Sequence, residues 1–334
     1  MENKTILSGI TATGKLTIGN YFGAIKNLVE CQDKYNLYAF IANLHAITIS
    51  IESKILSENI FEMLKIYKAC GLDFKKSNIY LQSDIKAIGT LNWVLTCQTT
   101  IGELSRMTQY KDKSQNIKAG NNTNYIPTGI LTYPILMASD ILLFSPDIVS
   151  VGVDQKQHVE LTRDLAIRFN NKYTTTFKIP KFETPKVGSK IFDLMDPTKK
   201  MSKSSGNQKS YIQILDSPSI IRKKISSAIT DSENIVKYDP NLKPGVSNLI
   251  TIYASAKDIS IREAENLLRN KNYKEFKDAV SDSLINILTP IQERYKDIDL
   301  DDIKNDLENN AKKLNKLANN NLDIILKKTG INIF

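Results

Sequence analysis

Lys200 and Lys203 lie in segment 197–207, among small hydroxyl-bearing residues and residues that favour turns. Such a segment cannot bury a core, and Pro197 ends the alternating, strand-like run 190–195 before it, so the lysines are predicted to lie on a mobile loop. Mobile ammonium groups suit a reaction in which negative charge builds up on phosphates that then depart. A solvated basic loop, or an ordinary nucleic-acid patch, is the alternative that the lysines alone leave open.

A second candidate phosphate site lies near the N-terminus. The apolar run Lys4–Leu7 is closed by Ser8-Gly9, and Thr17–Tyr35 then carries apolar residues at helical spacing. This pattern predicts a strand, a glycine turn and a helix whose free N–H groups attract an anion. Segment 9–15 satisfies most of a P-loop pattern, but Leu16 follows where that mechanism needs a hydroxyl for Mg²⁺, so a P-loop is rejected.

The third candidate is a predicted helix over 133–144, with Pro134 placed in its first turn. Tyr133, Met137 and Asp140 are spaced at i, i+4 and i+7, so one face carries a phenol, a thioether and a carboxylate. A carboxylate on an otherwise apolar helix is costly unless a neighbouring group donates a hydrogen bond to it. It is therefore either a ligand acceptor, a cap or half of an internal salt bridge.

Two motifs and a series of ordered blocks carry a family resemblance. Segment 200–204, Lys-Met-Ser-Lys-Ser, resembles the signature loop of class I aminoacyl-tRNA synthetases, and Thr17-Ile18-Gly19-Asn20 resembles their other signature in the form common among tryptophanyl-tRNA synthetases. The supporting blocks are Ser8-Gly9-Ile10, Leu44-His45-Ala46-Ile47-Thr48, Ile101-Gly102-Glu103-Leu104, Arg106-Met107-Thr108-Gln109, Leu131-Thr132-Tyr133-Pro134, Gly152-Val153-Asp154-Gln155-Lys156-Gln157-His158 and Asp196-Pro197-Thr198-Lys199. The resemblance runs nearly the whole length of the chain.

The resemblance implies activation of L-tryptophan by Mg²⁺-ATP to tryptophanyl-adenylate and pyrophosphate, followed by transfer to the 3′ end of tRNA(Trp). It also implies a homodimer and catalysis without a protein nucleophile. The residues implied to stabilise the negative charge of the phosphates are Lys113, Lys200 and Lys203. Lys113 is chosen by its distance from Gln109, and both Lys111 and Lys113 are predicted to lie on an exposed, flexible loop.

The same resemblance implies two sets of binding residues. The ATP set is Thr11, Thr13, Thr17, Gly19, Asn20, Gly152, Asp154, Met201 and Ser202. The tryptophan set is Leu7, His45, Tyr133, Met137, Asp140, Val149, Val151 and Gln155. Within the second set Asp140 is implied to accept the indole N–H, and Gln155 with Tyr133 to bind the amino group. Helix caps remain the alternative for Thr17, Asn20 and Asp154, and His158 is expected to be structural.

Two other functions stay open. The tyrosyl branch shares the fold and both signatures, and it usually has a tyrosine near Leu7 that bonds the substrate hydroxyl. Leu7 cannot do so, although it and Thr11 also depart from the tryptophanyl pattern, which usually has an aromatic residue at Leu7. A catalytically silent RNA-binding paralogue would have lost signature residues, and none is lost here.

Composition bounds the architecture. The chain has 334 residues, 41% apolar and 24% charged, which suits one large core and a smaller domain, and its net charge of +9 suits a polyanionic partner. Three widely spaced cysteines and two histidines indicate a reducing compartment without structural zinc. The most apolar run, 135–144, is too short to span a bilayer. The sequence therefore predicts a cytoplasmic protein.

Residues 1–206 are predicted to form a Rossmann-like parallel sheet between helices. Residues 37–43 and 77–82 have strand patterns, with a helical pattern over 51–70 between them. After the lysine loop the predicted elements are helices: from Pro218 towards 229, 246–256, one opened by a capping box at Ser260–Glu263, 272–295 interrupted by Pro290, and 299–328 closed by Gly330. The resemblance implies that 207–296 reads the tRNA anticodon, with 297–334 as a C-terminal helix.

Overall fold

The centre of the molecule is a five-stranded parallel sheet with the order β3-β2-β1-β4-β5. The computed structural model describes residues 4–12, 14–119, 126–183, 190–202 and 206–333. The strands are β1 Thr5–Thr11, β2 Asn36–Ala42, β3 Asn78–Leu81, β4 Ile148–Ser150 and β5 Lys181–Glu183. The predicted parallel sheet is confirmed. Because β1 pairs with β2 on one side and β4 on the other, the winding reverses there, and ligands of such sheets bind outside the carboxyl ends at this point.

Alternate side chains of the central strands feed two cores. Ile6, Leu37 and Ile41 pack towards one core, which is completed by α1 Ile18–Asn20, the π-turn Tyr21–Ile25, α2 Lys26–Cys31 and α4 Ser53–Ala69. Leu7 and Tyr38 pack towards the other, which is completed by α5 Ala87–Thr96, α8 Thr128–Phe144 and α9 Lys156–Tyr173. The shorter elements are α3 Asn43–Ala46, η2 Gln82–Asp84, α6 Ile101–Ser105, α7 Thr108–Ala119 and η3 Val153–Gln155. Burial on both faces explains why β2 is a continuous apolar run.

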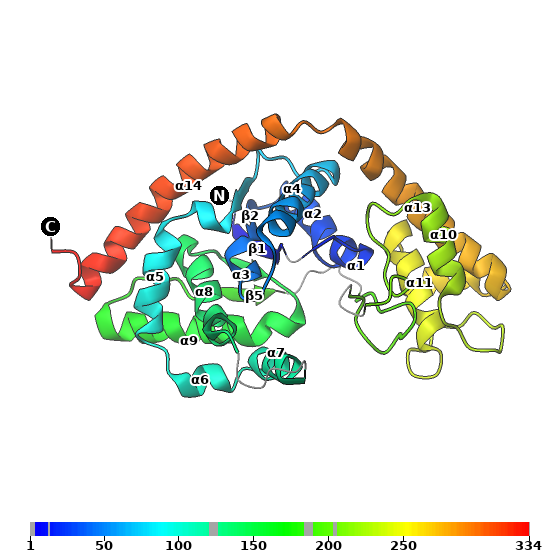
Figure 1. Ribbon diagram of the computed structural model, residues 1–334, viewed down its shortest axis with the longest axis horizontal. Coiled ribbons are helices and arrows are strands. Elements are labelled where there is room, and N and C mark those ends of the chain that lie inside the picture. Colours follow the sequence, from blue (N-terminus) through cyan, green and yellow to red (C-terminus); the bar gives the residue numbers. More distant parts are fainter. Residues whose placement is uncertain (1–3, 13, 120–125, 184–189, 203–205, 334) are drawn as a thin grey trace.

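A helical domain follows the sheet, and Figure 1 shows it to one side of the α/β domain. Its helices are α10 Pro218–Ser227, α11 Pro244–Lys257, α12 Ile261–Leu268 and α13 Tyr273–Asp297. The last helix, α14 Leu300–Thr329, then runs back along the α/β domain, so that the C-terminal end lies far from the helical domain (Figure 1). Among the described residues, every helix is too short or too polar to span a lipid bilayer.

The predicted start of α12 and the predicted end of α14 are confirmed. The side chain of Ser260 accepts a hydrogen bond from the backbone of Glu263, and the Glu263 carboxylate accepts from the backbone of Ser260, so the predicted capping box opens α12. Asp299 caps α14 at one end, and Gly330 closes it with a left-handed φ of 76°. These features depend on a few neighbouring residues, which is why the sequence alone predicts them.

Several element predictions are wrong where a distant partner decides the outcome. The run 190–195 is not a strand, because it finds no sheet neighbour and makes only an isolated bridge between Phe192 and Lys200. Strand β1 does not stop at Ser8-Gly9 but continues to Thr11, paired throughout with β2. Gly9 serves this pairing, since a Cβ there would lie 2.5 Å from the ring of Phe40.

Three helices also differ from the sequence prediction. Helix α8 begins at Thr128, so Pro134 lies inside it rather than in its first turn. Helix α13 passes through Pro290 without interruption. The expected flexible loop around Lys113 is helix α7, because residues 108–119 contain neither glycine nor proline and the helix packs against α6 and α8.

Helix α14 is bound to the α/β domain by polar side chains as well as by its apolar stripe. The amide of Asn310 donates to the carbonyls of Phe74, Ser77 and Ile79 at 2.9, 3.3 and 3.0 Å, where the chain enters β3. Further along, Leu314, Ala318, Leu322 and Ile325 are part of the second core. The last helix therefore completes the domain that begins with β1.

Replacing Asn310 with alanine should lower the free energy of unfolding by about 1–3 kcal/mol, because buried carbonyls lose their donor. Urea denaturation measures this change. The matched control is Asn309→Ala on the exposed side of the same helix, which should stay within about 0.5 kcal/mol of the wild type. Equal effects of the two substitutions would contradict the assigned role of Asn310.

Candidate active site

Polar residues follow the carboxyl ends of β1, β2, β3 and β4, at the edge of the sheet where the winding reverses. His45 lies just beyond β2 in α3, Gln82 directly follows β3, and Asp154 follows β4 in η3. Helix α1 begins after β1, with Thr17 as its N-cap. Since parallel strands end at one edge, these residues are brought to one side of the sheet.

Asp140 is the most deeply buried charged group of this region, with 1% of its surface exposed. Gln82 Nε2 donates to both of its oxygens, at 3.0 Å to Oδ1 and 2.8 Å to Oδ2, and His45 Nε2 lies 3.2 Å from Oδ2. Burial raises the pKa of Asp140 above its usual range, and the hydrogen bonds from His45 and Gln82 limit the rise. The helix residue predicted as an acceptor thus has the donors that its burial requires.

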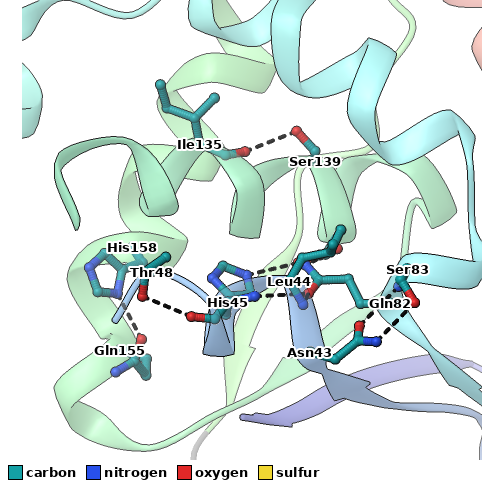
Figure 2. A network of polar contacts seen from close by, with 11 residues as sticks. Asn43, Leu44, His45, Thr48, Gln82, Ser83, Ile135, Ser139, Gln155 and His158 are labelled. Atoms are coloured by element: carbon teal, nitrogen blue, oxygen red, sulfur yellow. Dashed lines mark hydrogen bonds and ion pairs between the residues drawn. The ribbon is translucent and has the colours of Figure 1, made fainter. Parts of the chain in front are cut away.

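Gln82 is a site residue that sequence reasoning missed. Its Oε1 accepts from the backbone N–H groups of Leu44, at 3.0 Å, and His45, at 3.3 Å, while its Nε2 holds Asp140. Figure 2 shows this bridge from β3 to the start of α3, beside the paired amide of Asn43 and hydroxyl of Ser83. The available signal is position: a glutamine at the carboxyl end of a buried parallel strand points into the ligand edge.

A second polar cluster lies at the other end of the same face of α8. Tyr133 Oη lies 3.0 Å from His158 Nε2, and Gln155 Oε1 lies 2.8 Å from His158 Nδ1 (Figure 2 shows the latter pair). Burial lowers the pKa of His158 to about 4, with Lys113 adding to the decrease, and burial raises the pKa of Tyr133. His158, expected only as a structural residue, contacts two of the predicted ligand-binding residues.

Asp154 lies in the 3₁₀ turn η3 and not at the helix N-cap, which is Gln155. It accepts a hydrogen bond from Gln155 Nε2 at 3.0 Å. A Cβ on Gly152 would lie 2.5 Å from Asp154 Oδ1, so a larger residue there would displace the carboxylate from its present position. The predicted pair of Gly152 and Asp154 is therefore locally interdependent.

Lys113 lies in helix α7, with its Nζ 4.2 Å from the centre of the Tyr133 ring. Burial lowers the pKa of this ammonium group, and the charge of Asp154 opposes the decrease. The N-terminus of α7 is attached to the first turn of α9, since Gln157 Oε1 accepts from the backbone N–H and the hydroxyl of Thr108. A cation is thereby held beside the phenol rather than on a free loop.

The two signature segments lie against each other. A Cβ on Gly19 would be 3.8 Å from the Cβ of Met201 and 3.4 Å from Thr17 Oγ1. Asn20 Oδ1 accepts from the backbone N–H of Thr17 at 2.9 Å and from its hydroxyl at 3.0 Å, so the predicted cap is present. Cap and ligand roles are compatible, because each side chain retains further hydrogen-bonding capacity.

The helical domain is hydrogen-bonded to the run that precedes the lysine loop. Asn248 of α11 donates to the carbonyl of Phe192 at 3.0 Å and accepts from its N–H at 2.9 Å. The N–H of Met201 donates to Ile191, which leaves Lys200 and Ser202 on the exposed side. Lys203 and Thr13 lie outside the described residues.

The other predicted pocket residues lie on the sheet and on α8. Leu7 and Val149 are opposite each other across the β1–β4 pair, and both are buried. Val151 and Met137 are half-buried, and Thr11 is exposed at the end of β1. No group of three or more histidine, cysteine or acidic side chains among the described residues could hold a metal ion.

Comparison with known proteins identifies the family. A family model for class I tRNA synthetases (W and Y) matches residues 1–289. The chain belongs to this family. The resemblance seen in the two signatures is thereby confirmed.

Relatives over nearly the full length share one name. The tryptophan–tRNA ligase of Mycoplasmopsis pulmonis is 50% identical over 99% of both chains. The crystal structure of tryptophanyl-tRNA synthetase from Mycoplasma pneumoniae is 38% identical, covers 98% of both chains and has a TM-score of 0.90. The Campylobacter jejuni enzyme, solved with ADP and tryptophan, is 32% identical, covers 98% of this chain and 99% of its own, and has a TM-score of 0.79.

Because the pKa of Asp140 is raised in the folded protein, the free energy of unfolding should depend on pH. The folded protein binds this proton more tightly than the unfolded chain, so the free energy of unfolding falls as pH rises from the ordinary value of 3.8 through the raised native value. Asp140→Asn lacks this loss. Relative to the wild type, the variant should gain about 1.4 kcal/mol per unit of native pKa displacement, levelling off above the raised value.

Urea unfolding of the wild type and Asp140→Asn, each without ligands, across about pH 4 to 8 measures that difference. Parallel pH profiles for the two proteins would show that Asp140 titrates as in the unfolded chain.

Proposed function

We propose that this protein is a tryptophan–tRNA ligase, which activates L-tryptophan with ATP and transfers it to tRNA(Trp). The observation that carries the proposal is the carboxylate of Asp140, held by Gln82 and His45 on an otherwise apolar helix. An indole N–H can only donate a hydrogen bond, and an ionised carboxylate only accepts. The names of the full-length relatives support the same substrate.

In the first step an oxygen of the tryptophan carboxylate attacks the α-phosphorus of ATP, and the bond to pyrophosphate breaks. The enzyme acts by positioning and by stabilising the charge of the leaving pyrophosphate, so no protein nucleophile is needed. Lys113, Lys200 and Lys203 are proposed to supply that stabilisation. In that role Lys113 would leave the Tyr133 ring, from whose centre its Nζ now lies 4.2 Å away.

ATP is proposed to lie across the two signature segments. Thr17 and Asn20 contact phosphate at the start of α1, and Gly19 leaves room for the adenine beside Met201. Gly152 and Asp154 bind the ribose. Mg²⁺ enters with ATP as part of the substrate, because phosphate oxygens and water suit it better than a protein cage, and the described residues form no such cage.

The partners are proposed on coarser grounds. The net charge of +9 favours a polyanion such as tRNA, and the helical domain is proposed to read the anticodon. A homodimer is proposed from the family resemblance. Free Cys31, Cys70 and Cys97 fit a reducing compartment, so we propose a cytoplasmic location.

Pyrophosphate exchange with single amino acids tests the proposed substrate. Tryptophan should support exchange, and tyrosine should be poorer by at least about a thousandfold, because a site built around a specific hydrogen bond rejects mismatched ligands by large factors. Comparable exchange with tyrosine would favour the tyrosyl alternative. Exchange with neither amino acid would favour the silent RNA-binding alternative.

Lys200→Ala should lower the rate of adenylate formation by roughly a hundredfold or more and leave the tryptophan dissociation constant within about threefold, since the lysine acts on developing charge. Rapid-quench measurement of adenylate and equilibrium binding separate the two quantities. Lys209→Ala, which removes an exposed lysine just after the loop, is the matched control and should keep the wild-type rate. A loss of affinity equal to the loss of rate would make Lys200 a ground-state ligand.

A further inference from the structure

Four side chains form one continuous chain of hydrogen bonds, which includes the two residues expected to bind the amino group of the substrate. Asp154 Oδ2 is 3.0 Å from Gln155 Nε2, and Gln155 Oε1 is 2.8 Å from His158 Nδ1. His158 Nε2 is then 3.0 Å from the hydroxyl oxygen of Tyr133. This chain of hydrogen bonds joins the β4–α9 connection to helix α8, and its middle member, His158, is fully buried.

The direction of every bond follows from the carboxylate at one end. An ionised carboxylate only accepts, so the group of Gln155 that faces Asp154 is the amide NH₂. The reverse orientation would set two acceptor oxygens against each other at 3.0 Å. Asp154 thereby orients the carbonyl oxygen of Gln155 towards His158.

The position of the proton on His158 determines how Tyr133 orients its hydroxyl group. Because Gln155 Oε1 can only accept, the proton of the neutral imidazole is on Nδ1. Nε2 is then a bare acceptor, and Tyr133 directs its O–H towards it. Burial and the nearby charge of Lys113 lower the pKa of His158 to about 4, so the ring is neutral at physiological pH.

The two residues that face the ligand have only acceptor capacity left. Tyr133 has given its only proton to His158, so its oxygen offers lone pairs, and the carbonyl oxygen of Gln155 has a second lone pair. Both atoms are therefore acceptors towards a ligand, and a cationic N–H group suits two acceptors backed by the charge of Asp154. Asp154 acts on both residues: burial is the main cause of the raised pKa of Tyr133 and the charge of Asp154 adds to it, and the same charge opposes the lowered pKa of His158.

We propose that His158 is a positioning residue that fixes Tyr133 and Gln155 as acceptors for the ammonium group of the amino-acid substrate. This inference rests on the proposed function, which supplies the substrate. His158 itself does not touch the substrate. It selects the α-amino acid by determining which way the two contacting groups present their protons and lone pairs.

Ligand pairs that differ only in the ammonium group test the proposal. L-tryptophan and indole-3-propionate both carry the indole N–H and the carboxylate, and only tryptophan carries the amine. In His158→Phe, which keeps ring shape without polar atoms, the preference for tryptophan over indole-3-propionate in calorimetric titration should fall by about tenfold or more. His158→Gln, whose amide can both donate and accept, should keep most of the preference.

The outcomes separate the two hypotheses. Equal weakening of both ligands in His158→Phe, or an unchanged preference, would overturn the positioning role and leave the proposed function intact. A wild-type protein that binds neither ligand would instead contradict the proposed function. Thermal melting of each variant confirms that the fold is retained.

A second measurement needs only the wild-type protein for its main result. The chain contains two histidines, so labelling with ¹⁵N-histidine gives two ring systems, and a spectrum of the His45→Gln variant identifies the one that belongs to His158. At pH 7 the His158 ring should carry its proton on Nδ1 and none on Nε2. A proton on Nε2, or on both nitrogens, would overturn the proposed direction of the bonds.

Discussion

Removal of one carboxylate from water determines how the ligand edge is assembled. Asp140 loses nearly all of its hydration inside α8, which costs several kcal/mol unless donors replace the water. Those donors come from two different strand ends, Gln82 after β3 and His45 after β2. Gln82 also accepts from the backbone N–H groups of Leu44 and His45, so its side chain connects the sheet, α3 and α8. The buried carboxylate thus joins elements that are distant in sequence.

In the proposed binding mode, the two ends of the substrate would meet acceptors of different strength. In that mode a full carboxylate, Asp140, would face the indole end, and neutral oxygens of Tyr133 and Gln155 would face the ammonium end, with Asp154 one hydrogen bond further away. Keeping that second carboxylate out of direct contact leaves it able to bind a ribose hydroxyl. The arrangement also limits repulsion between protein carboxylates and the phosphates that must approach the same edge.

Prediction from sequence succeeds where neighbours along the chain decide the structure and fails where distant residues do. The capping box at Ser260 and the closing glycine of α14 are local, and both are confirmed. The extended run 190–195 looks like a strand, but only three-dimensional packing shows that no sheet edge accepts it. His158 and Tyr133 are 25 positions apart, so their contact follows from the packing of α8 on α9 and not from any motif spacing. The family signatures predict the kind of site, while Gln82 and the direction of its bonds require the fold.

The path of α14 has a consequence for how the protein is made. Residues 300–329 leave the ribosome after the whole helical domain, yet Leu314, Ala318 and Leu322 fill the core that contains Leu7 of the first strand. The core of the α/β domain is therefore incomplete until α14 has been synthesised. More than a hundred residues separate α9 at 156–173 from α14, and an apolar face stays uncovered while they are made. A nascent chain in this state is a natural client for chaperones that bind exposed apolar surface. Premature termination before α14 would yield a product that exposes the same face permanently, which marks it for aggregation or proteolysis.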